Sequence, residues 1–102
     1  METAPAQRQA AILFADIAGS TRLYETLGDA EALATIGHAL DVIRQVCEEH
    51  GGHIVKTIGD EAMAIFPNAA NAAYASITMQ TQVSGMKTSR GTPLSIHAGF
   101  HY

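Results

Sequence analysis

The sequence predicts an α+β fold in which helices cover one face of an antiparallel β-sheet. The prediction comes from the order of apolar segments along the 102 residues: a strand, two helices, two strands joined by a tight turn, a third helix and a last strand. This order is that of a ferredoxin-like βαββαβ unit with its first helix doubled. The length allows one domain, because a chain this short cannot bury two independent cores.

The first strand is predicted at residues 10–17, an almost wholly apolar run that only Asp16 interrupts. Such a run without alternation is typical of a central strand that is covered on both faces. The Gly-Ser-Thr sequence at residues 19–21 predicts a turn and an N-cap, and Gly28 ends the short helix that follows.

A longer helix is predicted from Asp29 to the glycine pair at residues 51–52. Its apolar residues recur with the spacing of one helix face, which predicts a single buried stripe. The stripe consists of Leu33, Ile36, Leu40, Ile43 and Cys47.

Two strands at residues 53–58 and 62–66 flank the short connection Gly59-Asp60-Glu61, which is typical of a hairpin. Asp60 is therefore expected at the hairpin tip. Asn68 is expected to cap an alanine-rich helix over residues 69–83.

The last strand is predicted at residues 94–100, which completes the sheet. The first strand is apolar on both faces, whereas the predicted helices cover only one face of this sheet. The second face therefore needs cover from a second copy of the chain or from a further segment. A dimer is the expectation that we favour.

Composition excludes several classes of protein. Ten acidic residues against six basic ones give a net charge of -4 with no basic stripe, which argues against binding to nucleic acid.

A single cysteine, Cys47, cannot form an internal disulfide and fits a reducing compartment, so we expect a cytoplasmic location. The longest apolar run, residues 10–15, is too short to span a membrane. Residues 1–9 do not resemble a signal peptide and are expected to be a disordered lead-in.

Two carboxylates are expected to converge at one end of the sheet. Asp16 ends the first strand, which lies beside the hairpin in this fold, and Asp60 lies at the hairpin tip. Carboxylate oxygens suit Mg²⁺ or Mn²⁺, which bridge phosphate oxygens. The helix start after Asp16 offers backbone N–H groups to the same phosphates, and Lys56 can reach a base or a phosphate. Together these features predict a nucleotide site.

Each of these motifs also has a structural explanation. An aspartate before Gly-Ser-Thr and a Gly-Asp pair at a hairpin tip are ordinary turn formers. The turn-former explanation is not sufficient for Asp16, because a carboxylate at the end of an apolar strand requires a partner or a metal ion to offset its desolvation.

The five histidines do not predict a zinc site. His97 and His101 are four residues apart on a strand, which separates them by about 13 Å. His50 and His53 lie on either side of two glycines and have no cysteine partner.

Two segments resemble the signature segments of class III adenylate and guanylate cyclase catalytic domains of the bacterial type. They are residues 14–21, Phe-Ala-Asp-Ile-Ala-Gly-Ser-Thr, and residues 52–66, Gly-His-Ile-Val-Lys-Thr-Ile-Gly-Asp-Glu-Ala-Met-Ala-Ile-Phe. Residues 96–100, Ile-His-Ala-Gly-Phe, resemble the strand that follows in that family. The resemblance runs in order over residues 10–102 and implies the N-terminal part of such a domain.

The resemblance implies an enzyme that cyclises a nucleoside triphosphate and releases pyrophosphate, at the interface of a head-to-tail homodimer. Asp16 and Asp60 match the two catalytic, metal-binding aspartates, and the backbone of Ile17 matches a carbonyl that also contacts metal. The family uses two Mg²⁺ or Mn²⁺ ions per site. One ion lowers the pKa of the ribose 3′-hydroxyl for attack on the α-phosphorus, and the other neutralises the triphosphate and the leaving pyrophosphate.

The resemblance also implies the substrate. Lys56 matches the base-reading lysine of adenylate cyclases, where guanylate cyclases usually carry glutamate, so ATP is favoured over GTP and the product would be cyclic AMP. Gly19, Ser20 and Thr21 would line the phosphate pocket. A signalling function follows from this product.

The resemblance ends with Tyr102, whereas the family continues through a second base-contacting residue and then an Asn and an Arg that stabilise the transition state. This chain on its own is therefore expected to bind Mg-ATP weakly and to turn over negligibly. The alternative function is a non-catalytic nucleotide-binding or dimerisation module of the same fold. A diguanylate cyclase is disfavoured because residues 58–62 lack the doubled glycine of that family, and a phosphate-loop NTPase is excluded because its Gly-x-x-x-x-Gly-Lys motif is missing.

Overall fold

The computed structural model describes residues 10–88, 91 and 94–101, so the predicted lead-in at residues 1–9 lies outside the described residues. Four strands form one antiparallel sheet in the order β2-β3-β1-β4. They are β1 (Ala11–Ile17), β2 (His53–Ile58), β3 (Glu61–Phe66) and β4 (Ile96–His101). This order and pairing confirm the predicted α+β, ferredoxin-like sheet.

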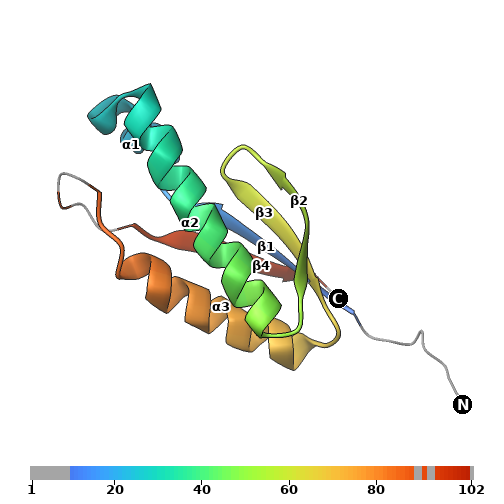
Figure 1. The fold of residues 1–102 in the computed structure, drawn as a ribbon. Coiled ribbons are helices and arrows are strands. Elements are labelled where there is room, and N and C mark those ends of the chain that lie inside the picture. Colours follow the sequence, from blue (N-terminus) through green and yellow to red (C-terminus); the bar gives the residue numbers. More distant parts are fainter. Residues whose placement is uncertain (1–9, 89–90, 92–93, 102) are drawn as a thin grey trace, which may run out of the picture.

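Three helices complete the fold: α1 (Ser20–Leu27), α2 (Asp29–Glu49) and α3 (Ala69–Ser84). The helices α2 and α3 lie side by side over one face of the sheet, and α1 lies beyond the end of the sheet at the start of α2 (Figure 1). The core is therefore a single layer between the sheet and two helices. Within the described residues, no helix is long and apolar enough to cross a membrane.

The buried stripe of α2 differs from the predicted one. Leu33 is 58% exposed and Leu40 is only partly buried, so the prediction was wrong for Leu33. Small residues take the inward positions, because alanine lets the helix approach the sheet and α3 closely. The residues of α2 that are buried are Ala32, Ile36, Ala39, Ile43, Val46 and Cys47.

Cys47 is fully buried in this core. Burial, together with the smaller effect of the nearby Glu48 charge, raises the pKa of the Cys47 thiol to about 11. The thiol is therefore neutral at physiological pH and packs as a small apolar side chain.

The two predicted helix caps have different outcomes. Asn68 caps α3 as predicted, since its side-chain oxygen accepts a hydrogen bond from the Asn71 N–H at 2.8 Å. The start of α1 has no side-chain cap, because Gly19 occupies the N-cap position in the left-handed conformation with φ at 73° and Ser20 is already helical. The last strand likewise begins at Ile96 rather than at residue 94.

Gly52 provides a test of the packing between the end of α2 and the sheet. A Cβ atom at Gly52 would lie 2.5 Å from two ring carbons of Phe66, a side chain that is only 1% exposed. We expect Gly52→Ala to lower the free energy of unfolding by about 1–3 kcal/mol, because the ring has no room to move. Urea denaturation measures the change.

The matched control for this substitution is Gly37→Ala in α2. A Cβ atom at Gly37 meets nothing within 4 Å, and the backbone is helical, so alanine should raise the free energy of unfolding by about 0.5–1 kcal/mol. Equal destabilisation by the two substitutions would contradict the steric explanation.

Candidate functional site

The pairing of β1 with β3 brings the two predicted carboxylates to the same end of the sheet. Asp16 lies opposite Glu61 in the register, next to the hairpin turn that contains Asp60. The Ile17 N–H donates a hydrogen bond to the Asp60 carbonyl at 3.1 Å. Asp16, Ile17 and Asp60 therefore lie together on neighbouring strand ends, as the sequence predicts.

The sheet face that points away from α2 and α3 is called the open face here. Asp16 belongs to it, and its side chain is 42% exposed. The centre of the open face is apolar and consists of Ile12, Phe14, Met63 and Ile65. Ile12 and Phe14 belong to β1, for which the sequence predicts apolar residues on both faces. Phe14 remains 37% exposed, so this face is less well covered than the helix side.

Lys56 lies on the open face because β2 contains a bulge. In the pairing of β2 with β3, Ile54 lies opposite Ala64 and Lys56 lies opposite Met63, while Val55 has no partner. Ala64 is buried beneath the helices and Met63 belongs to the open face, so the extra residue separates Ile54 and Lys56 onto opposite faces. Strict alternation would have put them on the same face, and the sequence gives no signal for the bulge.

The predicted phosphate-binding turn lies directly after β1. Gly19, in the left-handed conformation, redirects the chain from the strand into α1, and Ser20 and Thr21 form the first turn of the helix. The Leu23 N–H returns to the Gly19 carbonyl at 3.1 Å, which leaves the earlier N–H groups of the helix without an acceptor inside the helix. Such a helix start is suited to a phosphate group.

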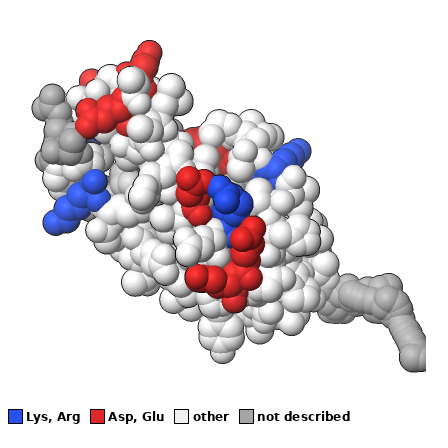
Figure 2. All heavy atoms as spheres, viewed as in Figure 1, with Lys and Arg blue, Asp and Glu red and all other residues white. Residues whose placement is uncertain are grey.

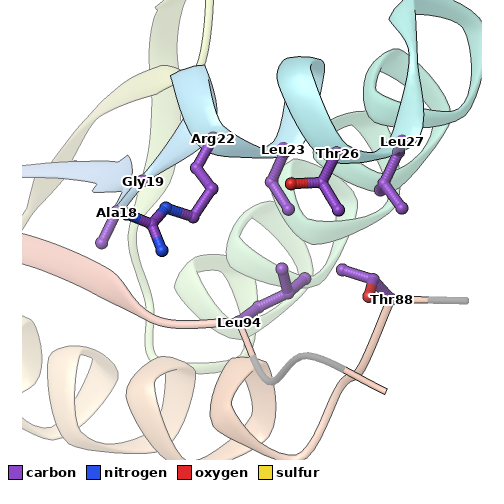
Figure 3. Close-up of a pocket in the computed structure, with 8 residues that line it drawn as sticks. All are labelled: Ala18, Gly19, Arg22, Leu23, Thr26, Leu27, Thr88 and Leu94. Atoms are coloured by element: carbon purple, nitrogen blue, oxygen red, sulfur yellow. The ribbon is translucent and has the colours of Figure 1, made fainter. Parts of the chain in front are cut away.

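A cavity of about 190 Å³ lies between α1 and the segment that leads into β4 (Figure 3). Its lining is Ala18, Gly19, Arg22, Leu23, Thr26, Leu27, Thr88 and Leu94. Gly19 is the one predicted site residue in this lining, which contains neither the two aspartates nor Lys56. Arg22 extends its guanidinium group from α1 over the cavity and adds a cation near the phosphate-binding turn, a feature to which the sequence analysis gave no role (Figure 3).

His97 is a further side chain beside Asp16 that sequence reasoning left without a function. It lies opposite Asp16 in the register of β1 and β4, and its Nδ1 atom is 3.9 Å from the Asp16 Oδ1 atom. The two residues are 81 positions apart in the chain, so only the strand pairing brings them together.

The donor set at this end of the sheet fits a hard divalent cation. Among residues 10–88, 91 and 94–101, no group of three or more His, Cys, Asp or Glu side chains encloses a metal position. Mg²⁺ does not need such a cage, because it retains several waters and is usually held by one or two carboxylates together with substrate phosphates. Asp16 and Asp60, with the Ile17 carbonyl beside them, offer such an open oxygen site.

The helix-covered side carries a different charge pattern. Figure 2 shows acidic side chains gathered over α2, which carries Asp41, Glu48 and Glu49, with Arg44 paired to Asp41 between them. The open face carries charges of both signs, because Lys56 shares it with Asp16 and Glu61.

The chain is similar to known nucleotide cyclases. Residues 2–102 match the model of the family described as "Adenylate and Guanylate cyclase catalytic domain". The adenylate cyclase of Anabaena cylindrica is 33% identical over 108 residues, which cover 96% of this chain and 22% of that protein. The adenylate cyclase of Lachancea kluyveri is 37% identical over 82 residues, which cover 80% of this chain and 4% of that protein.

A solved structure has the same fold. The guanylate cyclase domain of RhGC from Catenaria anguillulae, in complex with GTP, superposes with a TM-score of 0.80 at 20% sequence identity. The match covers 91% of this chain and 55% of that chain. This chain therefore spans about half of a solved domain and a small part of the curated relatives.

Proposed function

This chain belongs to the family of adenylate and guanylate cyclase catalytic domains, and from this premise we propose that it supplies the metal-binding and nucleotide-binding part of an adenylate cyclase. In the proposed reaction the ribose O3′ atom of ATP bonds to the α-phosphorus, pyrophosphate leaves and the hydroxyl proton is released. The product is cyclic AMP, an intracellular signal. The observation that carries the proposal is the hydrogen bond from the Ile17 N–H to the Asp60 carbonyl, which brings Asp16 and Asp60 to neighbouring strand ends.

The two aspartates are proposed to hold two Mg²⁺ or Mn²⁺ ions, with the Ile17 carbonyl as a further oxygen ligand. When bound, these ions supply charge stabilisation for the attacking ribose oxygen and for the phosphates. The backbone hydrogen bond between Ile17 and Asp60 holds the two strand ends together, which keeps the residues of both aspartates at the same end of the sheet. The turn at Gly19, Ser20 and Thr21 then presents N–H groups to the phosphates.

Lys56 is proposed to select adenine. A lysine ammonium group donates hydrogen bonds and accepts none. The N1 atom of adenine accepts a hydrogen bond, whereas the N1 atom of guanine carries a hydrogen and donates one, so a lysine that contacts N1 favours ATP over GTP. The names of the curated relatives, which are adenylate cyclases, support the same substrate.

The open face is proposed to be the contact surface of a head-to-tail homodimer. Its apolar centre leaves Phe14 37% exposed, and Ile58 on the same face is 61% exposed. A second copy of the domain would cover this apolar surface, as is usual for symmetric oligomers.

The 102-residue chain produced alone is proposed to bind nucleotide without turnover, as a module that holds substrate. The support for this is its coverage of 55% of a solved cyclase domain chain. The resemblance implies that the Asn and Arg that stabilise the transition state follow the matched part, and the loss of such a group costs several kcal/mol.

The proposed function is tested by calorimetric titration of the chain with a non-cyclisable ATP analogue in the presence of Mg²⁺ or Mn²⁺. We expect binding that requires the metal and that weakens at least about tenfold in Asp16→Asn, because one charged ligand is lost. Glu49→Gln, an exposed carboxylate at the far end of α2, is the control and should bind as wild type does. Binding without metal, equal affinity in Asp16→Asn, or no binding at millimolar analogue would overturn the proposal.

A further inference from the structure

The cavity between α1 and the segment that leads into β4 shares only Gly19 with the proposed nucleotide site. Its volume is about 190 Å³. Drug-sized ligands occupy pockets of about 300–1,000 Å³, so this cavity suits a molecule that is no larger than a single substituted ring.

The walls of the cavity are largely apolar. Leu23 of α1 is 6% exposed and Leu94, two residues before β4, is 3% exposed, and both side chains point into the cavity (Figure 3). Leu27, which packs against the core, extends the apolar surface along α1. A hydrocarbon group that enters here removes apolar surface from water on both partners, so these walls favour a ligand with an apolar body.

Backbone hydrogen bonds hold the two walls in place. The Ala18 N–H donates to the Ser95 carbonyl at 2.9 Å, which ties the end of β1 to the residue after Leu94. The Leu94 N–H donates to the Met86 carbonyl at 3.2 Å. The cavity is therefore formed before a ligand arrives, and binding orders little of the chain.

Arg22 gives the cavity a positive charge. Its guanidinium group extends over the cavity from α1 (Figure 3), and within the described part of the chain no carboxylate forms a salt bridge with it. The described lining contains no carboxylate either. A guanidinium group can donate two parallel hydrogen bonds to one carboxylate, so Arg22 is suited to hold an acid.

We propose that this cavity binds a small aromatic carboxylate, with the carboxylate on the Arg22 guanidinium group and the ring between Leu23 and Leu94. An inorganic anion would leave the apolar walls without a partner, and a neutral ring would leave the guanidinium group without one. This binding requires neither a metal ion nor a nucleotide, so it is independent of the proposed function.

The test is a titration of the isotope-labelled 102-residue chain with sodium benzoate, followed by amide NMR in the absence of divalent ions. We expect a Kd on the order of 0.1–1 mM, with the largest shifts at the amides of Leu23, Thr26 and Leu94. Benzamide has a similar shape without the charge and should bind at least about tenfold more weakly. Inorganic phosphate has charge without a ring and should also bind at least about tenfold more weakly.

Two substitutions separate the effect of the charge from that of the shape. Arg22→Gln should weaken benzoate binding about tenfold or more and leave benzamide binding within about twofold, because only the charged contact is lost. Thr26→Leu places a larger side chain in the lining, so it should weaken both ligands. The control is Arg44→Gln on α2, which makes the same change in net charge outside the cavity and should bind benzoate as the wild type does.

Several outcomes would overturn the proposal. Equal affinities for benzoate and benzamide, or an unchanged benzoate affinity in Arg22→Gln, would show that the guanidinium group does not hold the carboxylate. Phosphate that binds as tightly as benzoate would show that the apolar walls contribute nothing. Amide shifts confined to residues outside the lining, or no shifts at millimolar benzoate, would show that the cavity does not take this ligand. None of these outcomes affects the metal-dependent titration with the ATP analogue, which decides the proposed function.

Discussion

Replacing Phe66 with alanine is expected to lower the free energy of unfolding by about 3–5 kcal/mol. Phe66 is the largest of the fully buried side chains among the described residues and is only 1% exposed. It lies at the end of β3, opposite Ala11 of the central strand, and its ring fills the space beside Gly52. The contact with glycine leaves no neighbouring side chain at that position to close the cavity.

The same substitution at Phe100 is the matched control. Phe100 lies opposite Leu13, on the helix side of the edge strand β4, but it is 41% exposed. We expect Phe100→Ala to cost less than half as much as Phe66→Ala, because less apolar surface returns to water. Urea denaturation at low protein concentration measures the free energy of unfolding of both variants. Equal losses of this free energy would contradict the conclusion that Phe66 contributes more to core packing than Phe100 does. A loss near 5 kcal/mol is comparable to the whole stability of many small domains, so circular dichroism should confirm that the variant folds.

Much of the fold could be predicted from local sequence signals. The hairpin followed from a glycine-containing connection between two apolar segments, and the start of α3 followed from Asn68, whose side chain does cap the helix. The sheet order followed from the order of elements, because this arrangement of strands and helices has few topologies. The closeness of Asp16 and Asp60 then followed from that topology.

Features that depend on packing could not be predicted in the same way. The buried face of α2 is centred on small residues such as Ala32 and Ala39, so hydrophobicity alone led to the incorrect inclusion of Leu33. The bulge at Val55 is a second example, because whether a strand accommodates an extra residue depends on its partner strand. The contact between His97 and Asp16 is a third, because it depends on the register between the first and last strands.

The bulge decides which face of the sheet Lys56 occupies. Lys56 lies across from Met63, which lies across from Phe14, and Asp16 follows two residues later on the same face of β1. The ammonium group and the carboxylate therefore share the open face from strands that are not adjacent. A nucleotide that spans this face would meet the aspartates with its phosphates and Lys56 with its base.

Lys56→Glu is expected to reverse the nucleotide preference of the chain. The loss of a charge-assisted hydrogen bond to adenine should weaken the metal-dependent binding of a non-cyclisable ATP analogue about 10-fold to 100-fold. Binding of the matching GTP analogue should improve, because a carboxylate accepts hydrogen bonds from the N–H groups of guanine. Calorimetric titration with both analogues measures the ratio of the two affinities, which is the quantity that the proposed base contact controls.

Lys87→Glu separates this effect from general electrostatics. Lys87 lies in a groove beside Glu31 and His38 of α2, away from the open face, and the substitution makes the same change in net charge. Added negative charge that simply repels triphosphates would weaken ATP and GTP analogues alike in both variants. A base contact at Lys56 instead changes the ratio of the two affinities in Lys56→Glu alone. If both variants weaken both analogues equally, Lys56 does not read the base.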